Sequence, residues 1–314
     1  MLQHESELHK VHWLTTWAVD PSLVGKGLGS RLMEEALALD VDLAIVGSKP
    51  ARRVSEKYGF HEVKPLDYVQ IDLVGWGKFN PDTLLQRISR KLLSLAGGKQ
   101  KTSPAFRPFE FILGALSRSI VLSLLKRRVG HHVENIRTER ASPGVIPAVQ
   151  KGPQMGRTGF YRDSSVVNWM IAHPWVLWQS ESEHLTYMFT DTREIEIFAW
   201  QVTDRNGTNL GYIAFQCTRL RNRRVLKVLD HQIVNETPEM LLALATKTAG
   251  YCKASMIEGP AELAKPIENS KLGKLTVVHR RRTCQVHPRS PDSVLARAWR
   301  QIEQSYCDGD MAFT

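Results

Sequence analysis

The alternation of apolar and polar positions predicts a compact series of elements in the first quarter of the chain. Between Trp13 and Asp72, short apolar runs alternate with amphipathic segments. Residue periodicity predicts strands over 13–20, 43–47 and 68–73, and helices over 30–39 and 50–58. Strands that alternate with helices are typical of an α/β domain.

The next stretch, residues 75–157, changes character and is interpreted as a helical connector followed by a linker. Helices are expected over 81–95 and 109–125, and a run rich in glycine and proline follows. In the second helix Leu116, Ile120 and Leu124 share an apolar face, which we expect to pack on a domain. Attachment to a membrane surface is the alternative. The apolar run is shorter than the ~20 residues that a membrane span requires.

From residue 158 to 314 the pattern predicts a second domain. A helix that begins near residue 164 and ends at His173–Pro174 precedes a three-strand meander with a hairpin turn at Asn206–Gly207. A helix over 238–253, a strand over 255–259, a helical segment and one strand over 275–286 complete it. This order resembles that of the first stretch, which indicates a weak internal repeat or a chance likeness. The expected domains are therefore 1–74, 75–157 and 158–314.

Composition places the chain among globular proteins and leaves its ligand open. Of the 314 residues 42% are hydrophobic and 24% are charged, and the length suits about two domains. The four cysteines form no CxxC pair, which excludes the usual zinc spacings and predicts a reducing, cytoplasmic location. The formal net charge of +10 favours an anionic ligand, either nucleic acid or a phosphorylated small molecule.

The candidate chemistry lies in the glycine loop VGKGLGS, residues 24–30, between the first predicted strand and helix. Glycines at 25, 27 and 29 let the backbone approach a phosphate without a Cβ in the way. The amides at the start of the helix add donors and partial positive charge, which suits a pyrophosphate. The spacing does not match the Rossmann pattern, and Lys26 is followed by Gly27 where a P-loop requires Ser or Thr.

Two motifs in this region resemble the GNAT superfamily of N-acetyltransferases. The first is Val19-Asp20-Pro21 followed, after Ser22 and Leu23, by the glycine loop. The second is SKPARRVSEKYGF, which closes on Gly59 and Phe60 about 20 residues further on. Each motif alone is weak, and the two together at this separation are specific.

The resemblance implies an α/β fold of the GNAT type, with a mixed central sheet flanked by helices and two GNAT-like domains, the first incomplete. It implies transfer of an acetyl or similar acyl group from acyl-CoA to an amine acceptor, with acetyl-CoA as donor substrate and no metal. The cofactor-binding positions that it implies are Trp17, Ala18, Val19, Val24, Gly25, Lys26, Gly27, Leu28, Gly29 and Ser30.

The sequence departs from the family in ways that keep an alternative open. Val24 stands where the motif has Arg or Gln, and Ser55 stands where a tyrosine general acid is frequent, which makes Ser55 a weak catalytic candidate. The strands and helices that usually precede the motif are absent, so we expect either a late start or a surface supplied by the second domain. The alternative function is a catalytically inactive binding protein, or fragment, built on the GNAT scaffold.

The second domain carries NETPE where the first has its glycines, so we expect it to lack a CoA loop of its own. Thr237 and Pro238 are typical of a capped helix start. A catalytic pair of Asp230 and His231 on the preceding strand is a minor candidate. Nucleic acid is not expected as a partner, because no basic motif interleaved with aromatic residues accompanies the arginine clusters.

Overall fold

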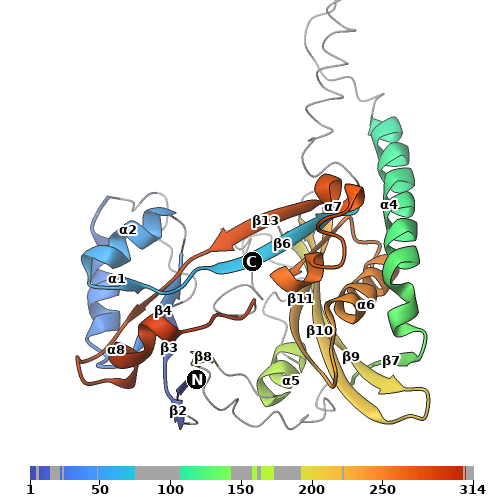
Figure 1. Ribbon diagram of the computed structural model, residues 1–314. Helices are drawn as coiled ribbons and strands as arrows, with labels where there is room; N and C mark the ends of the chain where they lie inside the picture. The colour runs from blue at the N-terminus through green and yellow to red at the C-terminus, as the bar shows by residue number, and fades with distance from the viewer. Residues whose placement is uncertain are drawn as a thin grey trace, which may run out of the picture.

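The computed structural model places two main sheets side by side, with helices on their outer faces (Figure 1). This arrangement confirms the predicted class, an α/β fold with mixed sheets flanked by helices. The structure describes residues 1–4, 7–14, 22, 25–47, 49–74, 107–142, 158–160, 164–172, 192–220, 223–306 and 308. The helix predicted over 81–95 lies outside these ranges.

The smaller main sheet has the strand order β3-β4-β14-β5 and carries the glycine loop. β3 and β4 run parallel, and α1 lies between them in chain order. Met33 of α1 is buried against Leu43, Ile45 and Phe60, which fixes the helix to the sheet. The elements are β3 (His12–Leu14), α1 (Leu28–Leu37), β4 (Leu43–Val46), α2 (Lys49–Lys57), β5 (His61–Glu62) and β14 (Cys284–His287).

The larger sheet has seven strands in the order β13-β6-β12-β11-β10-β9-β7. The predicted meander is confirmed, and its first hairpin turns at Gly207, which has a φ of 85°. β11 and β12 run parallel with α6 between them in chain order. The strands are β6 (Leu66–Asp72), β7 (Ile136–Arg140), β9 (Thr192–Asp204), β10 (Asn209–Leu220), β11 (Arg223–Ile233), β12 (Met256–Pro260) and β13 (Val277–Arg282).

Helices cover both faces of the larger sheet. α4 (Arg107–Val129) and α6 (Pro238–Tyr251) lie on one face, and α5 (Ser164–Ala172) lies on the other (Figure 1). The main core fills the space between the sheet and the first two helices, and it includes Phe215, Leu241 and Ile257. α6 contributes strongly to this core, because eight of its residues are buried.

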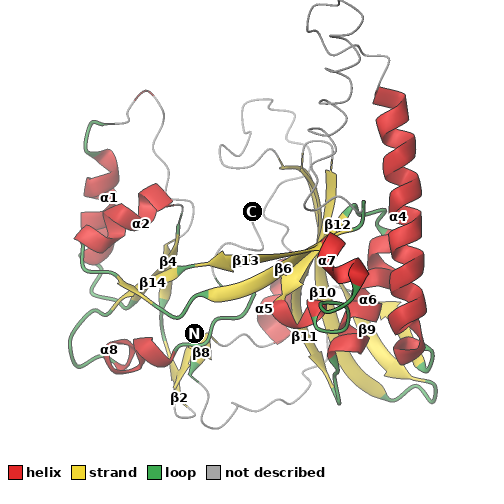
Figure 2. Ribbon diagram, turned by 45° about the horizontal axis from the view of Figure 1, so that its top comes forward, coloured by secondary structure: helices red, strands yellow, loops and turns green. Residues whose placement is uncertain are grey.

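The two sheets exchange strands between distant parts of the chain. β6 pairs with β12 and β13 in the larger sheet, although it follows directly on the elements of the smaller one. In return, β14 pairs with β4 and β5 in the smaller sheet. Figure 2 shows β6 and β13 reaching from the larger sheet toward the smaller one. The boundaries 1–74, 75–157 and 158–314 stay a prediction, and the strand pairing crosses them.

The single strand predicted over 275–286 is wrong, because the structure divides this segment into β13 and β14. The two strands belong to different sheets, with the chain passing from one to the other at Thr283. No glycine or proline interrupts residues 277–286, and the sequence therefore gives no local signal of the transfer.

The packing face predicted for the second connector helix is also wrong. Leu116, Ile120 and Leu124 of α4 are exposed, and the helix packs instead through a different face. Val121, Leu122, Leu125 and Val129 form that buried face against α6. Among the residues that the structure describes, no helix has both the length and the apolar character needed to cross a membrane.

Smaller elements complete the fold. A three-stranded sheet joins the start of the chain to a later segment through β2 (Glu7–His9), β1 (Leu2–His4) and β8 (Gly159–Phe160). Near the end of the chain, α8 packs close to β1 and β14. The remaining helical segments are η3 (Gly130–Val133), η4 (Ala261–Ala264), α7 (Lys271–Thr276), α8 (Val294–Ala298) and η5 (Trp299–Gln301).

Candidate functional site

The glycine loop adopts a backbone conformation that only glycine enters without strain. Gly25 has a φ of 84° and Gly27 a φ of 76°, both in the left-handed region. A residue with a Cβ at such a position costs about 1–2 kcal/mol. Gly27 is also the N-cap of α1, so the helix starts directly from this left-handed loop.

The entrance to α1 is open and lacks a side-chain cap. Among the described residues, and apart from the chain neighbours of each glycine, no heavy atom lies within 4 Å of the place where a Cβ would stand on Gly25 or Gly27. The N-cap residue Gly27 has no side chain that could accept a hydrogen bond from the first turn of α1. Among the described residues, the amides of Gly27, Leu28, Gly29 and Ser30 have no backbone partner either. These amides are the groups that a helix start offers to an anion.

The structure brings together six of the ten cofactor-binding positions that the sequence predicted. They lie on the loop and in the first turn of α1 and are Gly25, Lys26, Gly27, Leu28, Gly29 and Ser30. The other four, Trp17, Ala18, Val19 and Val24, lie outside the described residues. β3 ends at Leu14, so the loop follows the carboxyl end of a strand in a parallel pair. In open α/β sheets, ligands commonly bind at that end.

Ser55, the weak catalytic candidate, is enclosed by protein. It is fully buried on the inner side of α2, and its hydroxyl lies 2.6 Å from Oε1 of Gln285 on β14. The same hydroxyl also lies within hydrogen-bonding distance of the carbonyl oxygens of Ala51 and Arg52. These contacts fasten α2 to the sheet, which is a structural task. Tyr58 packs beside Phe60, as expected, and its hydroxyl donates to Glu34 of α1 at 3.2 Å.

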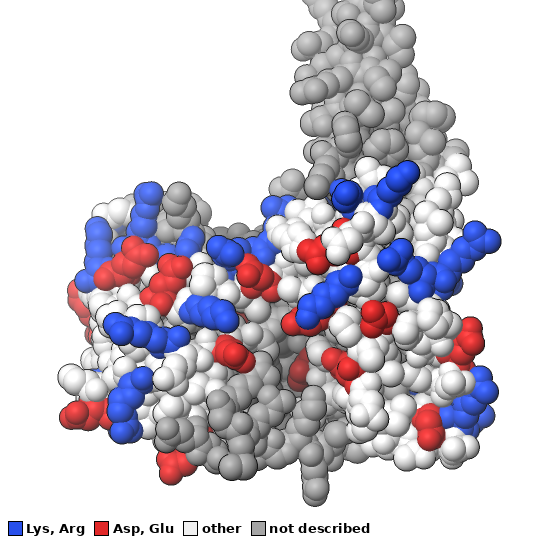
Figure 3. All heavy atoms as spheres, in the orientation of Figure 1, with Lys and Arg blue, Asp and Glu red and all other residues white. Residues whose placement is uncertain are grey.

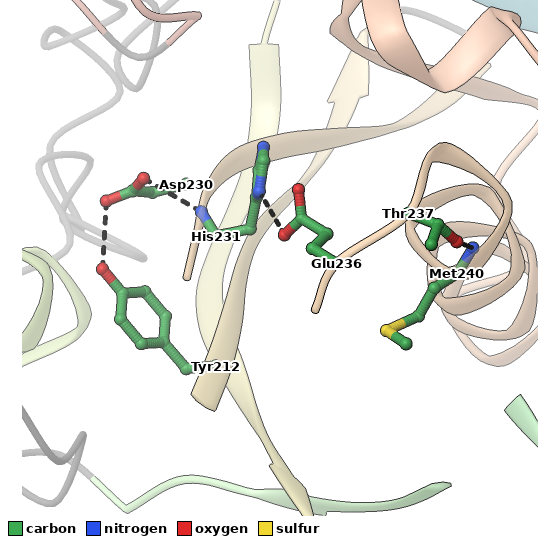
Figure 4. Close-up of polar contacts among 6 residues, drawn as sticks. All are labelled: Tyr212, Asp230, His231, Glu236, Thr237 and Met240. Carbon is green, nitrogen blue, oxygen red and sulfur yellow. Dashed lines mark hydrogen bonds and ion pairs between the residues drawn. The ribbon is translucent and has the colours of Figure 1, made fainter. Parts of the chain in front are cut away.

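The entrance to α6, drawn in Figure 4, is capped by a side chain, whereas the entrance to α1 is not. The side chain of Thr237 accepts a hydrogen bond from the amide of Met240 at 3.2 Å, and Pro238 occupies the first turn. This is the capped start that the sequence predicted. The cap occupies one of the amides that a phosphate would need. Glu236 and Glu239 add negative charge beside it.

Asp230 and His231 do not form the catalytic pair considered from the sequence. Adjacent residues of a strand point to opposite faces, and Asp230 accepts instead from the backbone amide of His231 and from the hydroxyl of Tyr212. The imidazole Nδ1 of His231 lies 2.7 Å from Oε2 of Glu236, and its second ring nitrogen points away from that carboxylate (Figure 4). A carboxylate only accepts hydrogen bonds, so Nδ1 carries the hydrogen.

Glu236 is therefore a residue whose role the sequence analysis missed. It lies five positions after His231, across a turn at Asn235, which has a φ of 54°. The positive φ of a non-glycine residue is the feature that folds the carboxylate back onto the strand, and asparagine tolerates it better than most residues. An imidazole held by a carboxylate can exchange protons at its other nitrogen. His231 lies in the larger sheet, away from the glycine loop.

The charged side chains on the surface are mixed in sign (Figure 3), and two of the clustered arginines have partners. On the face seen in Figure 3, Lys and Arg side chains stand among Asp and Glu side chains on both parts of the molecule. Two of the clustered arginines have partners, since Arg281 pairs with Asp67 at 2.9 Å and Arg280 donates to Gln70 at 3.0 Å. Within the described ranges, no group of three or more His, Cys, Asp or Glu side chains could hold a metal ion.

No protein-family model matches the sequence, and no curated protein gives a significant match. Solved structures with a similar arrangement include a GCN5-related N-acetyltransferase from Anabaena variabilis, at 10% identity and a TM-score of 0.44 over 86% of this chain. A tandem GNAT protein from the clavulanic acid biosynthesis pathway is similar at 11% identity and a TM-score of 0.44, over 90% of this chain and 76% of its own length.

Eis1 from Mycobacterium abscessus is similar over 91% of this chain, at 13% identity and a TM-score of 0.39. This chain spans 53% of the Anabaena protein and 58% of Eis1, which is little more than half of each. These likenesses concern the arrangement of elements, and they do not bear on the substrate or the activity of this chain.

Proposed function

We propose that this protein is an acyltransferase that takes an acetyl or similar acyl group from acyl-CoA and transfers it to an amine. The observation that carries the proposal is the entrance to α1, where Gly25 and Gly27 hold left-handed conformations in open space above uncapped amides. Such a loop costs stability and has no structural partner among the described residues. A pyrophosphate would satisfy its donors.

The residues of the loop would bind and orient the donor substrate. The amides from Gly27 to Ser30 would hold the pyrophosphate, and Lys26 would add positive charge beside it. Strand residues 17–19 would pair with the pantetheine arm, as the resemblance to the GNAT family implies. Acyl-CoA supplies a thioester whose carbonyl carbon is open to attack by an amine. The contribution of the chain is to bring that carbonyl and the amine together, which lowers the entropic part of the barrier.

A binding protein without catalysis is the second candidate, and one observation favours it. The hydroxyl of Ser55 is buried and engaged by Gln285, so it has no access to a departing thiolate. In this candidate the glycine loop still binds a CoA derivative, and no acyl group moves. The two functions therefore share a ligand and differ in turnover.

Calorimetric titration with acetyl-CoA tests the proposal directly. We expect saturable binding to the unmodified protein and at least tenfold weaker binding to Gly27→Glu, which places a carboxylate where the phosphate would lie. Gly207→Glu is the matched control, because Gly207 has a φ of 85° and open space around it but lies in the β9–β10 hairpin. The control should bind as the unmodified protein does.

No binding heat with the unmodified protein, or equal weakening in both variants, would contradict the proposal. Circular dichroism on each variant separates loss of binding from loss of fold. Release of free thiol from acetyl-CoA in the presence of a panel of primary amines then separates the enzyme from the binding protein. Binding without thiol release would leave the second candidate standing.

A further inference from the structure

The helix α4 has one buried face and one exposed face, and both are apolar. Its buried face packs on α6 through residues of the main core that include Val121 and Leu125. On the other side, Leu116 is 56% exposed, Ile120 is 60% exposed and Leu124 is 44% exposed. A single exposed leucine is ordinary on a protein surface, but three large apolar side chains on one side of one helix indicate a contact surface.

The three exposed side chains form the apolar stripe of α4. They stand four residues apart, and residues at this spacing lie on the same side of an α-helix. At a rise of about 1.5 Å per residue, the stripe is about 12 Å long. Ser119 and Ser123 beside it are exposed and short, so they leave the apolar side chains accessible. Figures 1 and 2 show α4 at the outer edge of the molecule.

Basic side chains continue the stripe at its carboxyl end. Lys126, Arg127 and Arg128 are exposed and occupy the last turn of the helix. Arg127 follows Ile120 by seven residues, which is about two turns, so it lies on the same side as the stripe. Arg128 is held at the surface, because its Nε donates to the carbonyl oxygen of Pro266 at 2.7 Å. An apolar contact surface and a positive charge therefore lie next to each other on one side of α4.

The charge of α4 determines which kind of surface suits the stripe. Residues 111–129 contain four basic residues and no Asp or Glu, and the whole chain has a formal net charge of +10. A second copy of this chain would bring the same basic helix against itself, and like charges across an interface are unfavourable. A surface that is anionic outside and apolar inside is complementary to both the basic turn and the stripe.

We propose that α4 is a docking surface for a membrane that contains anionic phospholipids. Leu116, Ile120 and Leu124 enter the boundary between head groups and acyl chains, and Lys126 and Arg127 contact lipid phosphates. The helix lies in the plane of the membrane and stays packed on α6. The sequence left this attachment open as an alternative, and the structure favours it because the face that we expected to pack on a domain is the exposed one.

The docking surface goes beyond the proposed acyl transfer and does not depend on it. α4 packs on the larger sheet, whereas the glycine loop belongs to the smaller one. Binding to a membrane can therefore be measured without any CoA derivative, and Gly27→Glu should keep it. Loss of acetyl-CoA binding and loss of membrane binding are thus distinguishable failures.

Co-sedimentation of the full chain with lipid vesicles tests the proposal. One set of vesicles contains phosphatidylcholine and phosphatidylglycerol in equal parts, and the other contains phosphatidylcholine alone. We expect saturable binding to the anionic vesicles and at least tenfold weaker binding to the neutral ones. Binding to the anionic vesicles should weaken as salt is added, because salt screens exposed charges.

Two variants separate the apolar contribution from the charged one. Ile120→Gln removes the central side chain of the stripe and should weaken binding to the anionic vesicles about tenfold. Arg127→Gln removes one positive charge and should weaken the same binding about fivefold. Leu32→Gln is the matched control, because Leu32 is an exposed apolar residue of α1, which packs on the other sheet. This control should bind as the unmodified protein does.

Circular dichroism on each variant verifies the fold, and light scattering without lipid measures self-association. Leu116→Gln repeats the test at a second position of the stripe if Ile120→Gln changes the spectrum. Three results would overturn the proposal. They are the absence of binding to the anionic vesicles, equal binding by Ile120→Gln and Leu32→Gln, and a dimer of the unmodified chain that Ile120→Gln dissociates. The second result means that net charge alone holds the protein, and the third that a second copy covers the stripe.

Discussion

The two strand–helix–strand units of this protein have the same topology, but their helices start in different ways. Each has a parallel strand pair with a helix between the strands in chain order, β3-α1-β4 in one and β11-α6-β12 in the other. α6 starts at a threonine cap and a proline, whereas α1 starts at an uncapped glycine with a left-handed backbone. The capped start of α6 stabilises that helix. The uncapped start of α1 stabilises its helix less, and it leaves the amides of the first turn exposed.

Burial follows the same division. α6 has eight buried residues, and Met33 is the buried residue of α1. A helix with many buried side chains tolerates few substitutions without loss of stability. A helix with one buried side chain tolerates substitutions over most of its surface. We therefore expect the unit around α6 to hold the fold together and the unit around α1 to be the one that changes on ligand binding.

The largest effect expected from this comparison is on the stability of the core. Leu244 of α6 is 1% exposed, and Leu244→Ala should lower the free energy of unfolding by about 2–5 kcal/mol because it leaves a cavity. Leu32 of α1 is 53% exposed, and Leu32→Ala should change it by less than about 0.5 kcal/mol. Urea denaturation measures both. Similar losses in the two variants would remove the distinction between the helices.

Glycine-to-alanine substitutions should change the free energy of unfolding in opposite directions in the two units. Gly27→Ala should lower the free energy of unfolding by about 1–2 kcal/mol, because alanine is strained at a φ of 76°. Gly250 lies in the last turn of α6 with an ordinary φ and open space around it, so Gly250→Ala should raise stability by about 0.5–1 kcal/mol. Equal signs in urea denaturation would show that the loop conformation is not as described.

The helix cap gives a smaller effect. Thr237→Ala removes the acceptor for the amide of Met240 and should lower the free energy of unfolding by about 1 kcal/mol. Thr237→Ser keeps the acceptor and should be close to neutral. Thermal unfolding followed by circular dichroism compares the two. If the alanine and serine variants melt together, the cap contributes nothing.

The smallest expected effects are changes of stability with pH. One comes from His287 in the smaller sheet, and the other from Tyr306, which bonds to the larger sheet. Burial, with the nearby His61, lowers the pKa of His287 on β14, so the folded protein favours its neutral form. This stabilisation is complete above about pH 6.5 and is lost as the pH falls through the lowered pKa. His287→Gln should flatten the acid limb of a plot of melting temperature against pH.

Tyr306 responds at the other end of the scale. Its pKa is raised by burial and by Glu258, so the stabilisation is complete below about pH 10 and is lost as the pH rises through the raised value. Tyr306→Phe should flatten the alkaline limb and leave the acid limb unchanged. Tyr251 is 65% exposed, and Tyr251→Phe serves as the control. An alkaline limb that persists in Tyr306→Phe would contradict the assignment.

The local sequence determined the elements and the conformation of the glycine loop. Period-2 and period-3.6 patterns placed β4, α1, α2 and the meander, and the glycines at 25 and 27 marked the loop in which the structure shows left-handed conformations. The capped start of α6 followed from Thr237 and Pro238 in the same way. These features depend on residues close together in the chain, and so a sequence pattern can carry them.

Only the tertiary structure decided which distant segments meet. The exchange of β6 and β14 between the sheets, the burial of Ser55 against Gln285, and the pairing of His231 with Glu236 rather than Asp230 all depend on contacts that periodicity does not encode. The same holds for the apolar stripe of α4, which becomes notable only because the opposite face of the helix packs on α6. Burial and partnership are properties of the packed molecule, because they are set by residues that approach from elsewhere in the chain.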